Sequence, residues 1–195
     1  MIIRDAVTGT AAHVDANRDL HTFSVVETEI DAALEKGNAY NVNTGLIAMT
    51  GTATSACLYF KNDEVTDYVI VGFVTYVGVR SATVTDYPLF TVIKEPTGGD
   101  VISDATAVDI RSNSNFGSSN SLSSGTLCYK GKDGGTATGG STHAIVGVSE
   151  GRNQFSLPME LPRGSSVAIT VDLNTSGGAN VYVALIGYLK DANDA

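Results

Sequence analysis

Tryptophan is absent from this sequence, and cysteine, histidine and proline are scarce. Its two cysteines, Cys57 and Cys128, are far apart and neither belongs to a CxxC motif, which argues against a disulfide-rich scaffold or a cysteine-based zinc site. One disulfide between them is an alternative, but the sequence favours two free thiols buried as small hydrophobic side chains. The longest apolar stretch, residues 68–79, is much shorter than the roughly 20 residues that a membrane-spanning helix needs.

Positive charge is also in short supply. Twelve Lys and Arg residues face 21 Asp and Glu residues, which gives a formal net charge of −9 at pH 7. Binding to phosphate groups needs a basic stripe, and here the cations are scattered. We therefore expect no nucleic-acid partner and no membrane partner, and we interpret the acidity as a source of solubility.

Valine, threonine, glycine and serine dominate the composition instead. Val and Thr suit a pleated sheet, and the 21 Gly residues suit turns. With 43% hydrophobic and 17% charged residues, the chain can bury one sizeable core. The sequence predicts an all-β fold, an antiparallel β-sandwich of jelly-roll type with about ten strands.

Three regions are expected along the chain: an extended N-terminal arm over residues 1–20, a β-sandwich domain over residues 21–190, and a tail over residues 191–195. The arm lacks the apolar segment of a signal peptide, so we expect the protein to stay in the cytoplasm in which it is made. One short helical turn is predicted at residues 31–36, with Asp31 as N-cap and Gly37 after its end. The expected strands are residues 21–30, 46–50, 56–61, 68–80, 89–94, 126–130, 143–148, 154–161, 166–173 and 180–190.

Four segments between these strands have the composition of turns or loops. Residues 62–67 suggest a hairpin loop with a solvated acidic tip, and residues 95–99 suggest a turn. Residues 112–125 and 131–140 are polar, rich in Ser or Gly, and predict long surface loops.

The two longest predicted strands are apolar on both faces. An antiparallel sheet usually has one polar face, so something must cover the second apolar face of each strand. The cover is either the arm and the long loops or a neighbouring subunit. Tyrosine combines apolar area with a polar tip and favours the subunit. We therefore place a subunit interface at Tyr68, Tyr76, Tyr182 and Tyr188.

Motifs for chemistry are incomplete throughout. Around Gly131 and Lys132 a phosphate-binding loop lacks its first glycine and its Ser or Thr, and the spacing of Asp15, Asn17 and Asp19 lacks the rest of a calcium loop. His13 and His21 would be roughly 26 Å apart in an extended chain, which is no zinc spacing. We expect no enzyme activity, no cofactor and no metal, although distant Asp, His and Ser residues could still meet in a hydrolase site.

Several turn motifs carry a resemblance to a known group of proteins. They are Gly-Asn-Ala-Tyr-Asn-Val-Asn-Thr-Gly at residues 37–45, Leu-Tyr-Phe-Lys-Asn-Asp-Glu at 58–64, Glu-Pro-Thr-Gly-Gly at 95–99 and the Asn-rich residues 113–119. With them the chain resembles small virion structural proteins of tailed bacteriophages, and is similar to capsid decoration, or cement, proteins.

This resemblance implies a jelly-roll or related sandwich fold and a homo-oligomer, commonly a trimer, on the outer surface of the virion. The implied partner is the major capsid protein, and the implied site of synthesis is the bacterial host cytoplasm. The alternative within the same group is a tail or fibre component whose loops at residues 112–140 bind glycans on the host surface.

Overall fold

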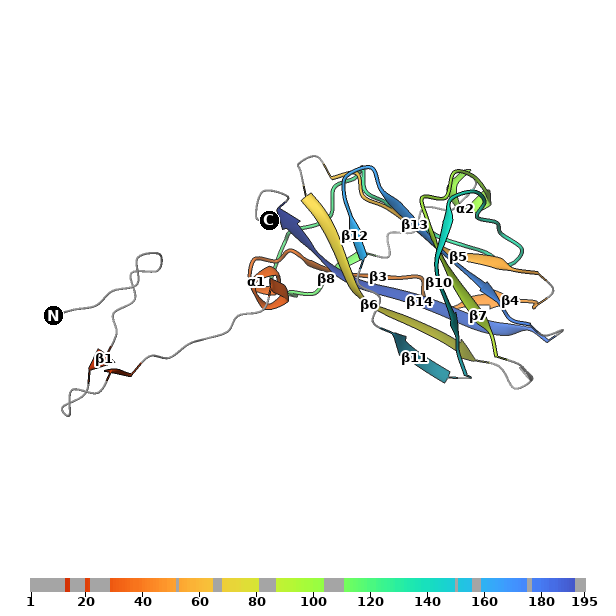
Figure 1. Ribbon diagram of the computed structural model, residues 1–195, viewed down its shortest axis with the longest axis horizontal. Helices are drawn as coiled ribbons and strands as arrows, with labels where there is room; N and C mark the ends of the chain where they lie inside the picture. The colour runs from red at the N-terminus through yellow and green to blue at the C-terminus, as the bar shows by residue number, and fades with distance from the viewer. Residues whose placement is uncertain are drawn as a thin grey trace.

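The computed structural model describes residues 13–14, 20–21, 29–51, 53–64, 68–80, 87–103, 111–149, 151–155, 159–174 and 177–191 (Figure 1). In chain order the elements are β1 (His13–Val14), β2 (Leu20–His21), α1 (Glu29–Glu35), β3 (Ala39–Asn43), β4 (Ile47–Met49), β5 (Ser55–Lys61), β6 (Tyr68–Arg80), β7 (Leu89–Lys94), α2 (Asp100–Ser103), β8 (Arg111–Asn113), β9 (Leu127–Lys130), β10 (Ser141–Gly147), β11 (Gly151–Phe155), β12 (Met159–Leu161), β13 (Ser166–Asp172) and β14 (Ala179–Asp191).

Two sheets contain nearly all of these strands. One has the order β10-β7-β13-β5-β9, and the other has the order β11-β6-β14-β3-β8, with β12 also paired to β6 and β4 paired to β14. Every strand pair in the described part of the chain is antiparallel. The prediction of an antiparallel all-β protein is confirmed. Strands β6 and β14 run beside one another for most of their length (Figure 1).

A single hydrophobic cluster contains side chains from both sheets. Because side chains alternate along a strand, every second residue of β13 and of β14 enters this cluster. The contributors from these two strands are Val167, Ile169, Val171, Ala179, Val181, Val183 and Leu185. Each Val or Leu buried in this way contributes about 1.5–3 kcal/mol.

Short helices cover part of the outer faces. On β13, Ala168 points away from the main cluster and packs with Val101 of α2 in a second cluster. On the other sheet, α1 lies against β14 and β3. In the described part of the chain, two helices therefore cover part of the outer faces. The sequence had suggested the arm, the long loops or a neighbouring subunit for this role.

The helical prediction was incomplete. The chain has two helices in its described part instead of one, and α1 begins at Glu29, so Asp31 lies in its first turn and is not its N-cap. The predicted end is correct: Gly37 has a φ of 70°, its N–H bonds Leu34 O, and Asn38 N–H bonds Ala33 O. This is the Schellman arrangement, which needs a left-handed residue just after the helix.

Strand predictions were accurate where alternation was strong and failed in polar segments. The bounds of β6 and β7 are as predicted. Residues 39–43 and 111–113 form β3 and β8 although they were expected to be turn or loop, because tertiary pairing with β14 and with each other overrides their polar composition. The strand predicted at 154–161 is divided into β11 and β12, both paired to β6, and residues 156–158 lie outside the described residues.

The predicted N-terminal region is described only in part. Within the expected arm, β1 and β2 pair antiparallel with His13 opposite His21. The two histidines are therefore register partners on adjacent strands and do not have the roughly 26 Å separation of an extended chain. Of the strand predicted at 21–30, residues 29 and 30 are helical and residues 22–28 lie outside the described residues, as do the rest of the arm and most of the tail.

A β-bulge determines where Cys57 lies. In the pairing of β5 with β13, Leu58 is opposite Ile169 and Ala56 is opposite Thr170, so Cys57 is the extra residue. The bulge places Cys57 and Leu58 together in the main cluster, while Ala56 and Tyr59 belong to the second cluster. Cys57 and Cys128 are both free and buried, as the sequence favoured.

Both thiols should resist alkylation in the folded protein. Burial excludes the reagent, and it also raises the pKa of the Cys57 thiol, which suppresses the reactive thiolate. Mass spectrometry after iodoacetamide treatment should find no adduct under native conditions and two adducts in denaturant. Modification at the native rate of an exposed cysteine would contradict the burial.

Candidate functional site

The four tyrosines of the predicted interface lie on the adjacent strands β6 and β14. In the register Tyr76 is opposite Ala184, Tyr182 is opposite Gly78, and Tyr68 is opposite Asp191. The side chains of Tyr68 and Tyr76 lie outside the described part of the structure. Those of Tyr182 and Tyr188 are half-buried. The register thus brings the four residues onto one pair of strands, and the interface itself stays a prediction.

Tyr188 has an intramolecular partner. Its hydroxyl donates a hydrogen bond to Glu29 Oε2 at 2.5 Å, which links the first residue of α1 to β14. Partial burial, followed by this hydrogen bond and by the negative charge of Glu29, raises the pKa of Tyr188 to about 12. The residue therefore helps to hold α1 on the sheet.

This contact predicts a loss of stability at high pH. Because the folded pKa of Tyr188 lies above the ordinary value of 10.0, the contact stabilises the fold fully below pH 10 and is lost as the pH rises through about 12. Titration of tyrosinate absorbance should show a step near pH 12 that Tyr188→Phe removes. In the control Tyr87→Phe, which alters an exposed side chain, that step should persist. Its persistence in Tyr188→Phe would contradict the assignment.

A pocket of about 360 Å³ opens beside the edge strand β10. Its apolar lining comes from Val92, Val167, Met159, Leu161 and Pro162. Its polar lining comes from Lys94, Glu95, His143, Glu160, Ser165 and Ser166. Apolar walls with a few polar groups are typical of binding pockets, and this volume is near the lower limit for small-ligand sites.

Local backbone features shape the polar side of this pocket. Glu95 has a φ of 51°, an uncommon conformation for a residue with a side chain, and its carboxylate accepts hydrogen bonds from the N–H and the hydroxyl of Ser166. His143 lies at a β-bulge in β10, where the register shifts between Thr142 and Ala144. Bulges and left-handed residues often aim side chains at sites.

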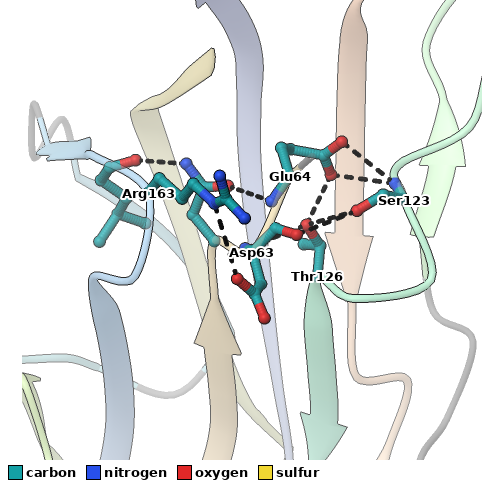
Figure 2. Close-up of polar contacts among 7 residues, drawn as sticks. Asp63, Glu64, Ser123, Thr126 and Arg163 are labelled. Atoms are coloured by element: carbon teal, nitrogen blue, oxygen red, sulfur yellow. Dashed lines mark hydrogen bonds and ion pairs between the residues drawn. The ribbon is translucent and has the colours of Figure 1, made fainter. Parts of the chain in front are cut away.

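The densest buried polar cluster surrounds Glu64, immediately after β5 (Figure 2). The Glu64 carboxylate accepts hydrogen bonds from Ser123 N–H at 3.0 and 3.2 Å and from the Thr126 hydroxyl at 2.5 Å. Asn62 donates to Leu161 O and accepts from Glu64 N–H. On the exposed side, Arg163 Nε lies 3.9 Å from Asp63 Oδ1.

This geometry corrects the prediction of a solvated acidic tip at residues 62–67. Asn62 is 0% exposed and Glu64 is 6% exposed, because the segments that follow β8 and β12 fold over them. Residues 65–67 lie outside the described residues. The contacts with Ser123 and Thr126 satisfy the Glu64 oxygens internally, so the cluster ties three segments together.

The long polar loops are also bonded to the body of the protein. Asn115 and Asn120 donate side-chain hydrogen bonds to Leu34 O and Lys36 O at the end of α1. In the second loop, Asp133 accepts bonds from the N–H and hydroxyl of Thr50, and Gly131 N–H bonds Cys57 O. These contacts hold in place two segments for which the composition predicted only long surface loops.

No group of three or more His, Cys, Asp or Glu residues in the described part of the chain has the arrangement of a metal site. Among the described helices, none has the length and apolar character required to span a membrane. Comparison with known proteins gives no match, either to a family model or to a curated protein. The phage resemblance therefore depends on the turn motifs alone.

Sequence reasoning missed the pocket and the Glu64 cluster. Glu95 belonged to a predicted turn and His143 to a predicted strand, and neither motif indicates that the two residues line one cavity. The Pro and Gly residues after Glu95 were the one usable signal, since they mark a constrained backbone next to a charged side chain.

Proposed function

We propose that this chain is a structural, non-enzymatic virion protein of a tailed bacteriophage, a capsid decoration protein that binds and stabilises the assembled shell. The order of the strands carries the proposal. The strand orders β3-β14-β6-β11 and β5-β13-β7-β10 support it, because they match the order expected for the two four-stranded sheets of a jelly roll, with β8 and β9 added at the far edges. Jelly rolls are common in viral capsid and lectin domains.

The surface supports a role in assembly. Tyr87, Leu89, Phe116 and Ile145 expose large apolar side chains on a body whose polar loops are bonded internally. Phe116 is 98% exposed at the apex of a turn held by Asn115, whose side chain accepts a hydrogen bond from Gly117 N–H. Aromatic side chains presented on a rigid scaffold are suited to anchor a protein partner.

Stabilisation of a shell would follow from mass action. A protein that binds the assembled shell but not the dissociated subunits adds its binding free energy at every occupied position. A homotrimer that contacts three neighbouring capsid subunits would also gain from effective concentration. The proposed partners are therefore other copies of the chain and the major capsid protein, and the proposed location is the outer capsid surface.

The oligomeric state is the first test. Light scattering should give about three times the chain mass of 20.2 kDa. If the tyrosine interface is right, Tyr76→Asp and Tyr182→Asp should reduce this mass with little change in the melting temperature. An unchanged mass with a lowered melting temperature would place these tyrosines inside one subunit.

Particle binding is the second test. Purified virions of the phage that encodes the chain should carry it in many copies, and shells without it should open at a lower temperature. Deletion of residues 2–19 should weaken particle binding but leave the sheets folded if the arm bridges to the shell. Normal decoration by the deletion variant would exclude that role for the arm.

A tail or fibre component that binds host glycans is the second candidate. The jelly-roll strand order also favours it, because lectins share that architecture. Against it, the side chains of Asn115, Asn120 and Asp133 in the proposed binding loops are engaged by the chain itself. A glycan array with host envelope sugars distinguishes the two candidates, since only the second requires binding.

A further inference from the structure

Strand β10 is an unprotected edge. It pairs with β7 on one side, and no other described strand pairs with it. Its sequence, Ser-Thr-His-Ala-Ile-Val-Gly, contains no Lys, Arg, Asp, Glu or Pro. Edge strands in soluble proteins are usually blocked by charged residues or proline, since their free N–H and C=O groups pair with other strands. Only the bulge at His143 interrupts this edge.

Exposed apolar side chains lie on the outer face beside this edge. Ala144 and Val146 pack against the main core, so Ile145 between them faces outward and is 62% exposed. Leu89 is the register partner of Gly147 and is 40% exposed. A strand added to β10 would place alternate side chains over this outer surface.

The pocket lies on the inner side of the same edge. Its floor includes the core residues Val92 and Val167, and it continues beneath β12 through Met159 and Leu161. Glu95 and Glu160 belong to its lining, as does Lys94, so these charged residues leave one net negative charge at the pocket. The intervening side chains of an added strand would point toward this cavity, which can accept an apolar side chain.

We propose that the β10 edge binds an extended segment of a partner protein that carries alternating apolar residues and at least one Lys or Arg. The segment adds as a strand to β10, inserts one apolar side chain into the pocket, covers Ile145 with another, and places its cation near Glu95 and Glu160. Peptide addition to a sheet edge obtains affinity from backbone hydrogen bonds and specificity from side-chain pockets.

Charge selects this occupant over a second copy of the chain. Each copy has a net charge of −9, and β10 itself has no cation to offset the negative charge that remains among Lys94, Glu95 and Glu160 at the pocket of the other copy. Edge-to-edge pairing of two copies would therefore bring like charges together, whereas a basic segment is attracted. This inference does not depend on the phage proposal, because it concerns the β10 edge of this chain and holds whichever protein supplies the bound segment.

The test uses the full chain and a short synthetic peptide in which valine and threonine alternate, with one lysine near its centre. Binding is measured by calorimetry and mapped by amide chemical shifts. A peptide of the same length and charge, with proline at alternate positions, is the control, since it cannot form the strand. We expect shifts confined to residues 141–147 and to the pocket lining, and weaker binding at higher salt.

Two matched pairs of variants examine the side chains. Ile145→Lys should weaken binding about tenfold by placing a charge on the edge, whereas Phe116→Lys, which alters an exposed apolar residue elsewhere, should not. Glu160→Gln should weaken binding about threefold, whereas Glu35→Gln on α1 should not.

Three results of the binding experiments would overturn the proposal. They are equal binding of the proline peptide, equal binding by the Ile145→Lys variant, and shifts located away from β10. Spontaneous dimers cross-linked through β10 would also overturn it, because the occupant would then be a second copy.

Discussion

Glu64→Ala should lower the free energy of unfolding by about 3 kcal/mol, because a buried polar group that loses its partner costs about 1–3 kcal/mol and two donors are affected. The carboxylate is 6% exposed and accepts bonds from Ser123 N–H and the Thr126 hydroxyl. Its removal also leaves a cavity among three chain segments. Urea unfolding monitored by circular dichroism measures the loss.

Two further variants make this prediction specific. Glu35→Ala removes an exposed carboxylate from α1 and should change stability by less than about 0.5 kcal/mol. Glu64→Gln keeps one acceptor oxygen, so its loss of unfolding free energy should lie between those of Glu64→Ala and Glu35→Ala. A double-mutant cycle of Glu64→Ala with Thr126→Ala should show coupling of about 1 kcal/mol or more. Equal losses for Glu64→Ala and Glu35→Ala would show that the cluster does not stabilise the fold.

Gly131→Ala should be at least as damaging. A Cβ at this position would lie 1.7 Å from Ala56 O and 2.4 Å from the carbonyl carbon of the same residue. Both are backbone atoms of β5, beside the bulge at Cys57, and Gly131 N–H bonds Cys57 O at 2.9 Å. Relief of the clash must move a strand or break this contact, so we expect a loss of about 3 kcal/mol and a melting temperature lower by about 10 °C.

Variants of two other glycines distinguish a steric clash of the added Cβ from strain at a positive φ. Gly147→Ala would place its Cβ 3.7 Å from Leu89 Cδ2, an ordinary contact, and should be nearly neutral. Gly134 has a φ of 68° with open space around it, so Gly134→Ala should lose only about 1 kcal/mol through strain. A melting temperature for Gly131→Ala equal to that of Gly147→Ala would contradict the close approach of the loop to β5.

The two long polar loops, residues 112–125 and 131–140, contribute contacts to the body of the fold. Residues 112–125 and 131–140 were candidates for partner contacts because of their composition, yet their backbone N–H groups and side chains bond to Glu64, α1 and β5. The surfaces proposed for partners are the β10 edge, which lies outside these loops, and the exposed Phe116 within the first of them. Variants in these loops should therefore be tested for stability before any loss of binding is assigned to them.

Local patterns in the sequence determined the all-β class, the bounds of β6 and β7, the end of α1 at Gly37 and the two free thiols. These features depend on neighbouring residues: alternation with a period of two identifies a strand, and a glycine after a short amphipathic run ends a helix. They were predictable because no distant contact is needed to produce them.

Only the tertiary structure decided the burial of Glu64, the second helix, the strand β3 and the pocket beside β10. Glu64 is buried by Ser123, 59 residues further along the chain, and Asn41 and its neighbours become a strand because β14 pairs with them. His13 and His21 are likewise register partners only because β1 pairs with β2. Such contacts join segments that are far apart in sequence, so a periodicity of two or 3.6 residues carries no information about them.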